Sequence, residues 1–223
     1  MMIKGAIIDL DGTLIDSMYI WDCLASQYLM LQGYKVNDEV NEAVKTMSLE
    51  EAAHYFQKKY HLSLSVLQII EGINDLLEKY YREIFELKNG VKQFLEILAK
   101  HNIQMCIASA SDEHLVNLVL NRCQIKHYFK DVFTCQQLNC DKNEPTIYNH
   151  ALTALNLNKD QVIVLEDSYH GAKTAKDHGY LVVGIYDEYE TRWQELKAIS
   201  DIFLKDYLQT EQIEKIFELS KGG

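Results

Sequence analysis

Short apolar runs alternate with helical patterns along most of this chain, and this alternation limits the folds that it can adopt. Runs of apolar and β-branched residues predict strands at residues 3–10, 104–108, 132–134, 162–165, 181–185 and 201–204. The residues between them predict helices over 91–100, from about 113, over 146–156 and over 171–178. Strands that alternate with helices favour right-handed βαβ units and a parallel sheet covered on both faces. The sequence therefore predicts an α/β fold with a Rossmann-like, doubly wound parallel sheet.

Between residues 18 and 87 the pattern changes to helices alone. Apolar side chains recur at positions i, i+3, i+4 and i+7, first in Trp21, Leu24, Ala25 and Tyr28. The chain contains one proline, which favours long uninterrupted elements over many short hairpins. We expect an all-helical domain over residues 17–87, inserted in an α/β core domain formed by residues 1–16 and 88–223.

The charge balance, the length of the apolar runs and the spacing of the cysteines exclude several classes of partner and location. The chain has 33 acidic and 22 basic residues, a formal net charge of −11, which repels the phosphate backbone that nucleic-acid-binding proteins neutralise. No apolar run reaches the roughly 20 residues that span a bilayer, and four charged residues interrupt the first 17 residues. The five cysteines lack a C-x-x-C pair, which is typical of reduced thiols. We expect a cytoplasmic protein that binds neither nucleic acid nor membrane.

Acidic, hydroxyl and lysine side chains follow directly after the predicted strands. They are Asp9 and Asp11 after the first strand, Ser109 and Ser111 after the second, Lys142 in the loop after the third, and Glu166 and Asp167 after the fourth. In parallel sheets ligands bind at the carboxyl ends of the strands, where these residues would meet. Three acids that can share a hard divalent cation, a hydroxyl and a lysine are the parts of a phosphoryl-transfer site that uses Mg²⁺.

These residues stand in four ordered motifs, Asp9-Leu10-Asp11-Gly12-Thr13, Ser109, Lys142 and Glu166-Asp167. In this order they resemble the motifs of the haloacid dehalogenase superfamily. The flanking residues Pro145, Tyr148 and Gly171 also agree with its subgroup of β-phosphoglucomutase and phosphoglycolate-phosphatase-like enzymes. The helical insertion between the first two motifs is similar to the helical cap of that subgroup. The resemblance covers essentially the whole chain.

The resemblance implies a role for each acidic residue of the first motif. Asp9 would attack the phosphorus atom and form an aspartyl-phosphate. With an ordinary pKa near 3.9, its carboxylate is already ionised and needs no separate base. Asp11 would act as general acid and base. Since the two are two positions apart, the chain must leave the extended conformation after the strand, and Gly12 is a suitable residue for that turn.

The resemblance also implies which residues hold the phosphate and the metal. Ser109, Ala110 and Lys142 would bind the phosphoryl group, the first two at the beginning of a helix. Mg²⁺ would be bound by the side chains of Asp9 and Asp167 and the backbone carbonyl of Asp11, with Glu166 as a direct or water-mediated ligand.

Two positions in the cap could border the substrate. Trp21 has a spacing that is typical of a helix core, and it could instead line the substrate entrance. Ser48 lies where related caps carry a loop that determines substrate specificity.

Four reactions or roles are compatible with these motifs. The first is a Mg²⁺-dependent phosphatase that hydrolyses a small phosphate monoester. The second is a sugar phosphate mutase, but related mutases usually have Val, His and Arg where this chain has Thr13, Trp21 and Leu49, so a contact for a second phosphate is missing. A metal-independent dehalogenase would lack the second aspartate and the acidic pair, and a catalytically silent binding protein would not need every catalytic position filled. We expect a phosphatase acting on a phosphorylated metabolite, and a monomer, with a dimer left open.

Overall fold

The computed structural model describes residues 2–45 and 47–219. The chain divides into two compact units, Met1–Ser17 with Phe85–Gly223, and Met18–Ile84. We call them the α/β unit and the helical unit. No helix in the described part of the chain is both long and apolar enough to cross a membrane.

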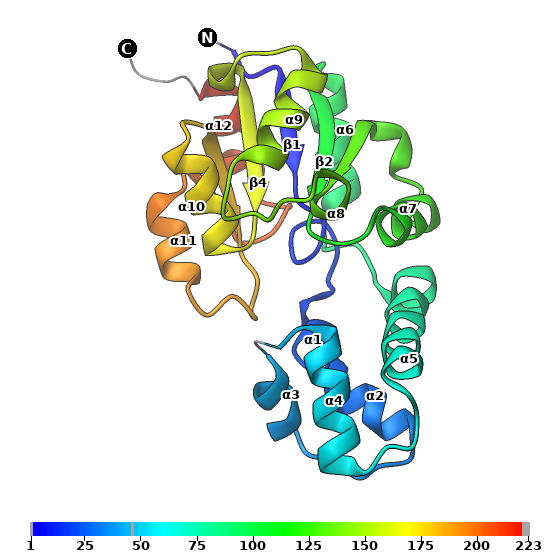
Figure 1. The fold of residues 1–223 in the computed structure, drawn as a ribbon. Coiled ribbons are helices and arrows are strands. Elements are labelled where there is room, and N and C mark those ends of the chain that lie inside the picture. The colour runs from blue at the N-terminus through cyan, green and yellow to red at the C-terminus, as the bar shows by residue number, and fades with distance from the viewer. Residues whose placement is uncertain (1, 46, 220–223) are drawn as a thin grey trace. The chain divides into compact units, whose positions relative to one another are not determined.

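The α/β unit contains one six-stranded parallel sheet (Figure 1). Its strands are β1 (Gly5–Ile8), β2 (Gln104–Ser109), β3 (Phe129–Thr134), β4 (Val162–Glu166), β5 (Leu181–Ile185) and β6 (Ile202–Leu204). Their order is β3-β2-β1-β4-β5-β6, so β1 lies between β2 and β4, with Ile8 opposite both Ile107 and Leu165. β1, β4 and β5 are buried along their whole length, which explains why they are continuous apolar runs. The predicted α/β fold with a parallel sheet is confirmed.

Helices cover both faces of this sheet. They are α6 (Val91–Lys100), α7 (Glu113–Arg122), α8 (Cys135–Leu138), α9 (Thr146–Leu155), α10 (Tyr169–Asp177), α11 (Trp193–Ile199) and α12 (Thr210–Glu218), with 3₁₀ turns at Lys126–Tyr128 and Lys159–Gln161. Figure 1 shows α9 and α10 in front of the sheet and α6 behind it. Side chains from α9, α10 and α11 pack on the strands in one apolar cluster, which includes Ile7, Val164 and Val182.

The element boundaries differ from the prediction in a few places. The ladder of β1 covers only Gly5–Ile8 of the expected 3–10, because the chain turns away from the sheet soon after. β3 begins three residues earlier than expected, and α10 begins at Tyr169, after the cap residue Ser168. The helices α8, α11 and α12 were not expected from the sequence.

The helical unit consists of α1 (Met18–Trp21), α2 (Leu24–Leu31), α3 (Glu39–Val44), α4 (Leu49–Tyr60), α5 (Val66–Lys79) and a π-helical turn at Tyr80–Ile84. Its described residues form no strand, in agreement with the helical pattern of the sequence. The core is aromatic and aliphatic: the rings of Tyr28 and Phe56 stack with centroids 6.3 Å apart, and Val40 and Ile73 are buried beside other apolar side chains.

Candidate active site

The chain turns sharply after β1, at the first motif. The backbone N–H of Asp9 still donates to the carbonyl of Leu165 at 3.0 Å, but the N–H groups of Leu14 and Ile15 both donate back to the carbonyl of Leu10. Gly12 has a φ of 73°, a conformation that favours glycine. The expected departure from the extended conformation is therefore present, and Asp9 and Asp11 do not lie on a continuous strand.

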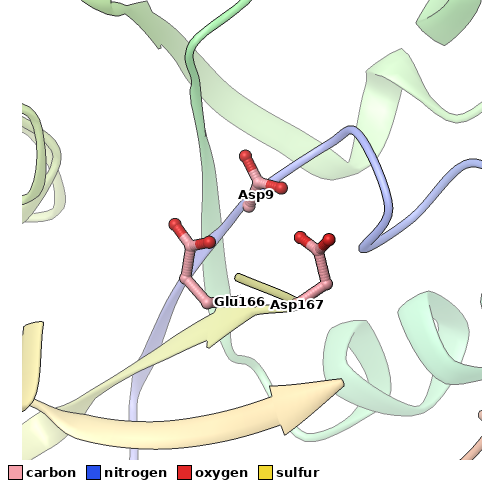
Figure 2. Close-up of side chains that lie close together, drawn as sticks. All are labelled: Asp9, Glu166 and Asp167. Carbon is pink, nitrogen blue, oxygen red and sulfur yellow. The ribbon is translucent and has the colours of Figure 1, made fainter. Parts of the chain in front are cut away.

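Three buried carboxylates meet at the ends of β1 and β4. Asp9, Glu166 and Asp167 each offer an oxygen atom, and these atoms lie within 4.8 Å of one another. Figure 2 shows the three carboxyl groups turned toward a shared space. Burial raises the pKa of Asp167, and the negative charges of Asp9 and Glu166 raise it further. Buried carboxylates that repel each other in this way fit a hard divalent cation, which prefers oxygen ligands.

Lys142 contacts two of these three carboxylates. Its Nζ donates to Asp9 Oδ1 and, at 2.7 Å, to Glu166 Oε1, and only 14% of its side chain is exposed. Burial opposes the charge of the ammonium group, but the neighbouring carboxylates of Asp9 and Glu166 outweigh it and raise the pKa of Lys142. Lys142 therefore remains charged beside Asp9.

Glu166 is held by several donors at once. Its Oε1 also accepts from the Tyr148 hydroxyl at 2.7 Å, and its Oε2 accepts from the Ser168 hydroxyl at 3.3 Å. These bonds orient the carboxylate toward Lys142 and use much of its capacity to accept hydrogen bonds. Asp167, in contrast, accepts one bond from the Thr13 hydroxyl at 2.9 Å, to its Oδ1.

Asp11 is not one of the three clustered carboxylates. Its two carboxylate oxygens accept from the hydroxyls of Ser17, at 2.8 Å, and Ser111, at 2.7 Å. The side chain is half-buried, and its bond to Ser111 reaches the loop after β2. These two serines fix the direction of the carboxylate without burying it completely.

The predicted phosphate-binding residues lie at the end of β2. Ser109 is fully buried, and its hydroxyl accepts from the backbone N–H of Ser111 at 3.1 Å. Ala110 follows it and is exposed, and α7 begins at Glu113. Ser109 and Ser111 thus form a compact turn whose side chains connect β2 to Asp11.

Both predicted cap positions belong to the helical unit. Trp21 ends α1, is 40% exposed, and lines a cavity of about 280 Å³ together with Leu24, Asn41, Lys45 and Phe56. Ser48 is exposed and caps α4, because its hydroxyl accepts from the N–H of Glu51 while the Glu51 carboxylate accepts from the N–H of Ser48. This reciprocal capping accounts for a serine at position 48 by helix stability alone.

Several hydroxyl groups that donate to the carboxylates of the site were given no role from the sequence, although Ser111, Thr13 and Tyr148 were named with the motifs. Thr13, Ser17, Ser111 and Tyr148 each donate a hydroxyl hydrogen bond to a carboxylate of Asp11, Glu166 or Asp167. Their positions next to the motif residues in the sequence were visible, but hydroxyl groups there are also common as turn or capping residues.

Comparison with known proteins identifies related sequences. A sequence model of the haloacid dehalogenase-like hydrolases matches residues 6–185. The phosphorylated carbohydrates phosphatase of Thermotoga maritima is 21% identical over 176 residues, which are 79% of this chain and 82% of that protein. Hexitol phosphatase B of Escherichia coli is 23% identical over 216 residues, covering 92% and 97%.

A solved structure shows the same fold. A Thermotoga maritima protein named provisionally as a β-phosphoglucomutase superposes with a TM-score of 0.83 at 20% identity, covering 97% of this chain and 100% of that one. The segment that matches the family includes all four motifs and most of the chain. The chain therefore belongs to the haloacid dehalogenase-like hydrolase family.

Proposed function

We propose that this protein is a Mg²⁺-dependent phosphatase that hydrolyses a small phosphate monoester through an aspartyl-phosphate. The observation that carries the proposal is the environment of Asp9. Its buried carboxylate follows β1, contacts Lys142 and shares a space with Glu166 and Asp167. The family is one of hydrolases, and the two relatives named above are called phosphatases.

Asp9 and Asp167 are the residues that we propose as side-chain ligands of the metal, together with the backbone carbonyl of Asp11. Glu166 is also near enough to contribute, although its hydrogen bonds to Lys142 and Tyr148 favour an orienting role. When bound, Mg²⁺ would supply positive charge that offsets the carboxylates and the phosphate dianion.

The chain's own residues would divide the reaction between two carboxylates. An oxygen of Asp9 attacks the phosphorus atom, a new O–P bond forms, and the bond between phosphorus and the ester oxygen breaks. Asp11 gives a proton to the departing alkoxide, then takes one from a water molecule that attacks the phosphorus and releases Asp9 and inorganic phosphate. Lys142 and the turn at Ser109 and Ala110 would hold the phosphoryl oxygens.

We further propose that the substrate is a phosphorylated carbohydrate or a related polyol, bound with the help of a cap. The named relatives act on phosphorylated carbohydrates and hexitol phosphates, which supports this class. In this proposal residues 17–87 form the cap, residues 1–16 and 88–223 form the core, and Trp21 borders the bound carbohydrate. Trp21 suits that role because it is an exposed aromatic side chain at a cavity that also contains Asn41 and Lys45.

The test is phosphate release from p-nitrophenyl phosphate and from a panel of sugar and hexitol phosphates. Asp9→Asn keeps the shape of the side chain but removes the nucleophile, so we expect release to fall at least about 1,000-fold. Asp16→Asn is the matched control, because Asp16 is an exposed aspartate in the same segment, and its activity should equal that of the wild type. Excess EDTA should abolish release, and added Mg²⁺ should restore it.

Two results would contradict the phosphatase proposal. Asp9→Asn protein that releases phosphate as fast as Asp16→Asn protein would exclude Asp9 as the nucleophile. Wild-type protein that interconverts two sugar phosphates when primed with a bisphosphate, and releases little phosphate, would make it a mutase.

A further inference from the structure

Tyr207 lies in the segment after β6, beyond residues 6–185 that match the family. Its side chain is only 2% exposed, and its ring packs against Phe94 of α6 with centroids 4.9 Å apart. Its hydroxyl donates to the backbone carbonyl of Thr13 at 3.0 Å, across 194 positions of sequence. A residue near the C-terminus thus contacts the first motif directly.

Thr13 extends this contact to the acidic group. The Thr13 hydroxyl donates to Asp167 Oδ1 at 2.9 Å, and both residues are buried, with Thr13 completely so. The next carbonyl in the loop, that of Leu14, accepts from the backbone N–H of Lys88 at 2.9 Å. The backbone that carries the Thr13 hydroxyl is therefore held at two successive carbonyls by segments distant in sequence.

We propose that Tyr207 is a positioning residue for the metal-binding carboxylate of Asp167, and that it acts through Thr13. The inference rests on the proposed function, because there Asp167 is a metal ligand. Residues that hydrogen-bond to a metal ligand fix its orientation, and their loss commonly weakens metal binding. Tyr207 is one residue further from the metal, so its contribution should be smaller than that of a direct partner.

The hydroxyl of Tyr207 is well suited to remain a donor. Burial raises the pKa of Tyr207, and the nearby carboxylates of Asp167 and Asp9 raise it further. Replacing this hydroxyl would leave the buried Thr13 carbonyl without the bond, in a place where the protein interior offers few substitutes.

The experiment is a titration of the purified, metal-free protein with Mg²⁺ alone. Binding is measured by calorimetry and by the rise in the unfolding temperature. Tyr207→Phe removes the hydroxyl and keeps the ring against Phe94. We expect it to bind Mg²⁺ about three- to tenfold more weakly than the wild type. In activity measurements, the Mg²⁺ concentration for half-maximal rate should rise by the same factor, whereas the KM for the ester at saturating Mg²⁺ should not change.

Tyr180→Phe is the matched control. Tyr180 is also buried, at 1% exposed, and its hydroxyl also makes one hydrogen bond, to Asn149 Oδ1 at 2.8 Å. Its removal should reduce thermal stability about as much as Tyr207→Phe does, with no change in Mg²⁺ binding. A role that is only structural would make the two variants alike.

A second variant tests the path through Thr13. Thr13→Val keeps the shape of the side chain but removes its bond to Asp167, so adding Tyr207→Phe to this background should weaken Mg²⁺ binding little further. Equal Mg²⁺ binding by wild type and Tyr207→Phe would overturn the inference, and so would full additivity with Thr13→Val. Wild-type protein that binds no Mg²⁺ would overturn both this inference and the metal site, whereas Mg²⁺ binding without phosphate release would overturn only the proposed function.

Discussion

Gly171 allows α10 to approach the Glu166 carboxylate more closely than any other residue would. A Cβ atom at this position would lie 2.8 Å from the carboxyl carbon and both oxygens of Glu166. These are not the far end of a freely moving side chain, because Glu166 is bonded to Lys142, Tyr148 and Ser168. A methyl group at position 171 must therefore displace the carboxylate or the helix.

Gly171→Ala tests how much the reaction depends on this arrangement. The added methyl group should destabilise the protein by about 1–3 kcal/mol by overpacking. Displacing Glu166 should also move Lys142 away from Asp9, so we expect kcat to fall about 10- to 100-fold. The loss of stability can be measured by urea denaturation, and kcat can be measured from phosphate release at saturating Mg²⁺.

Gly5→Ala provides the comparison for this variant. Its Cβ would also be crowded, at 2.7 Å from Leu157 Cδ1, but it lies at the beginning of β1, the end opposite to Asp9. This variant should change stability and leave kcat near the wild-type value. A Gly171→Ala enzyme with the kcat of Gly5→Ala would mean that the contact with Glu166 is unimportant for catalysis.

For the motif residues, the sequence predicts which side chains lie close together but not how their roles are divided. Because parallel strands end at one edge, the sequence could predict that Asp9, Lys142, Glu166 and Asp167 would lie near one another, and the structure brings their side chains together. The sequence could not distinguish a metal ligand from a residue that holds Lys142, because that distinction depends on which hydroxyl groups donate to Glu166. The chemical roles of these residues stay predictions.

Lys88 connects three segments of the α/β unit. It lies just before α6, its backbone N–H bonds to the first-motif loop at Leu14, and its Nζ donates to Asp187 Oδ2 at 2.7 Å and to the carbonyl of Tyr186 at 3.0 Å. The side chains of Lys88 and Asp187 are 17% and 3% exposed. Removing one partner of a buried ion pair leaves the other charge without compensation.

Lys88→Met is therefore expected to destabilise the protein by about 3 kcal/mol, as measured by urea denaturation. Lys173→Met is its control, because Lys173 pairs with Asp177 on the exposed surface of α10, where an ion pair contributes little. If both variants had the same urea midpoint as the wild type, the buried ion pair of Lys88 and Asp187 would not stabilise the protein.

Most elements with a buried apolar pattern were predictable, although α12 was missed, whereas the shortest helices were not. The six strands and the helices α6, α7, α9 and α10 lie near their predicted positions. Except for β3, whose residues are mostly exposed or half-buried, each buries a continuous run or a stripe of apolar residues. Among the unpredicted helices, α11 has seven residues, of which only Leu196 is buried, and α8 has four. A segment this short carries too few apolar positions to reveal a helical period.

The two compact units differ in what a metal ion should do to them. The three buried carboxylates belong wholly to the α/β unit, at the ends of β1 and β4, whereas the helical unit has its own core around Tyr28 and Phe56. A ligand that binds only the folded form stabilises the part of the molecule that forms its site. Mg²⁺ should therefore raise the unfolding temperature of the α/β unit alone.

The chain contains two tryptophans, and they report on the two units separately. Trp21 lies in the helical unit and Trp193 in the α/β unit. In Trp21→Phe protein, fluorescence would follow the α/β unit, and in Trp193→Phe protein it would follow the helical unit. Free Mg²⁺ at 100 times its dissociation constant should stabilise the α/β unit by about 2.7 kcal/mol, which for a domain of this size raises its unfolding temperature by roughly 5–10 °C.

The signal of Trp21 should not shift with Mg²⁺ if the units unfold independently, as domains with separate cores can. Asp167→Asn should abolish the shift of the Trp193 signal, because it removes a carboxylate from the acidic group, and Asp16→Asn should preserve it. Equal shifts of both tryptophan signals would show instead that the two units unfold as one cooperative body. A shift that survives in Asp167→Asn would mean that Mg²⁺ stabilises the protein from another site.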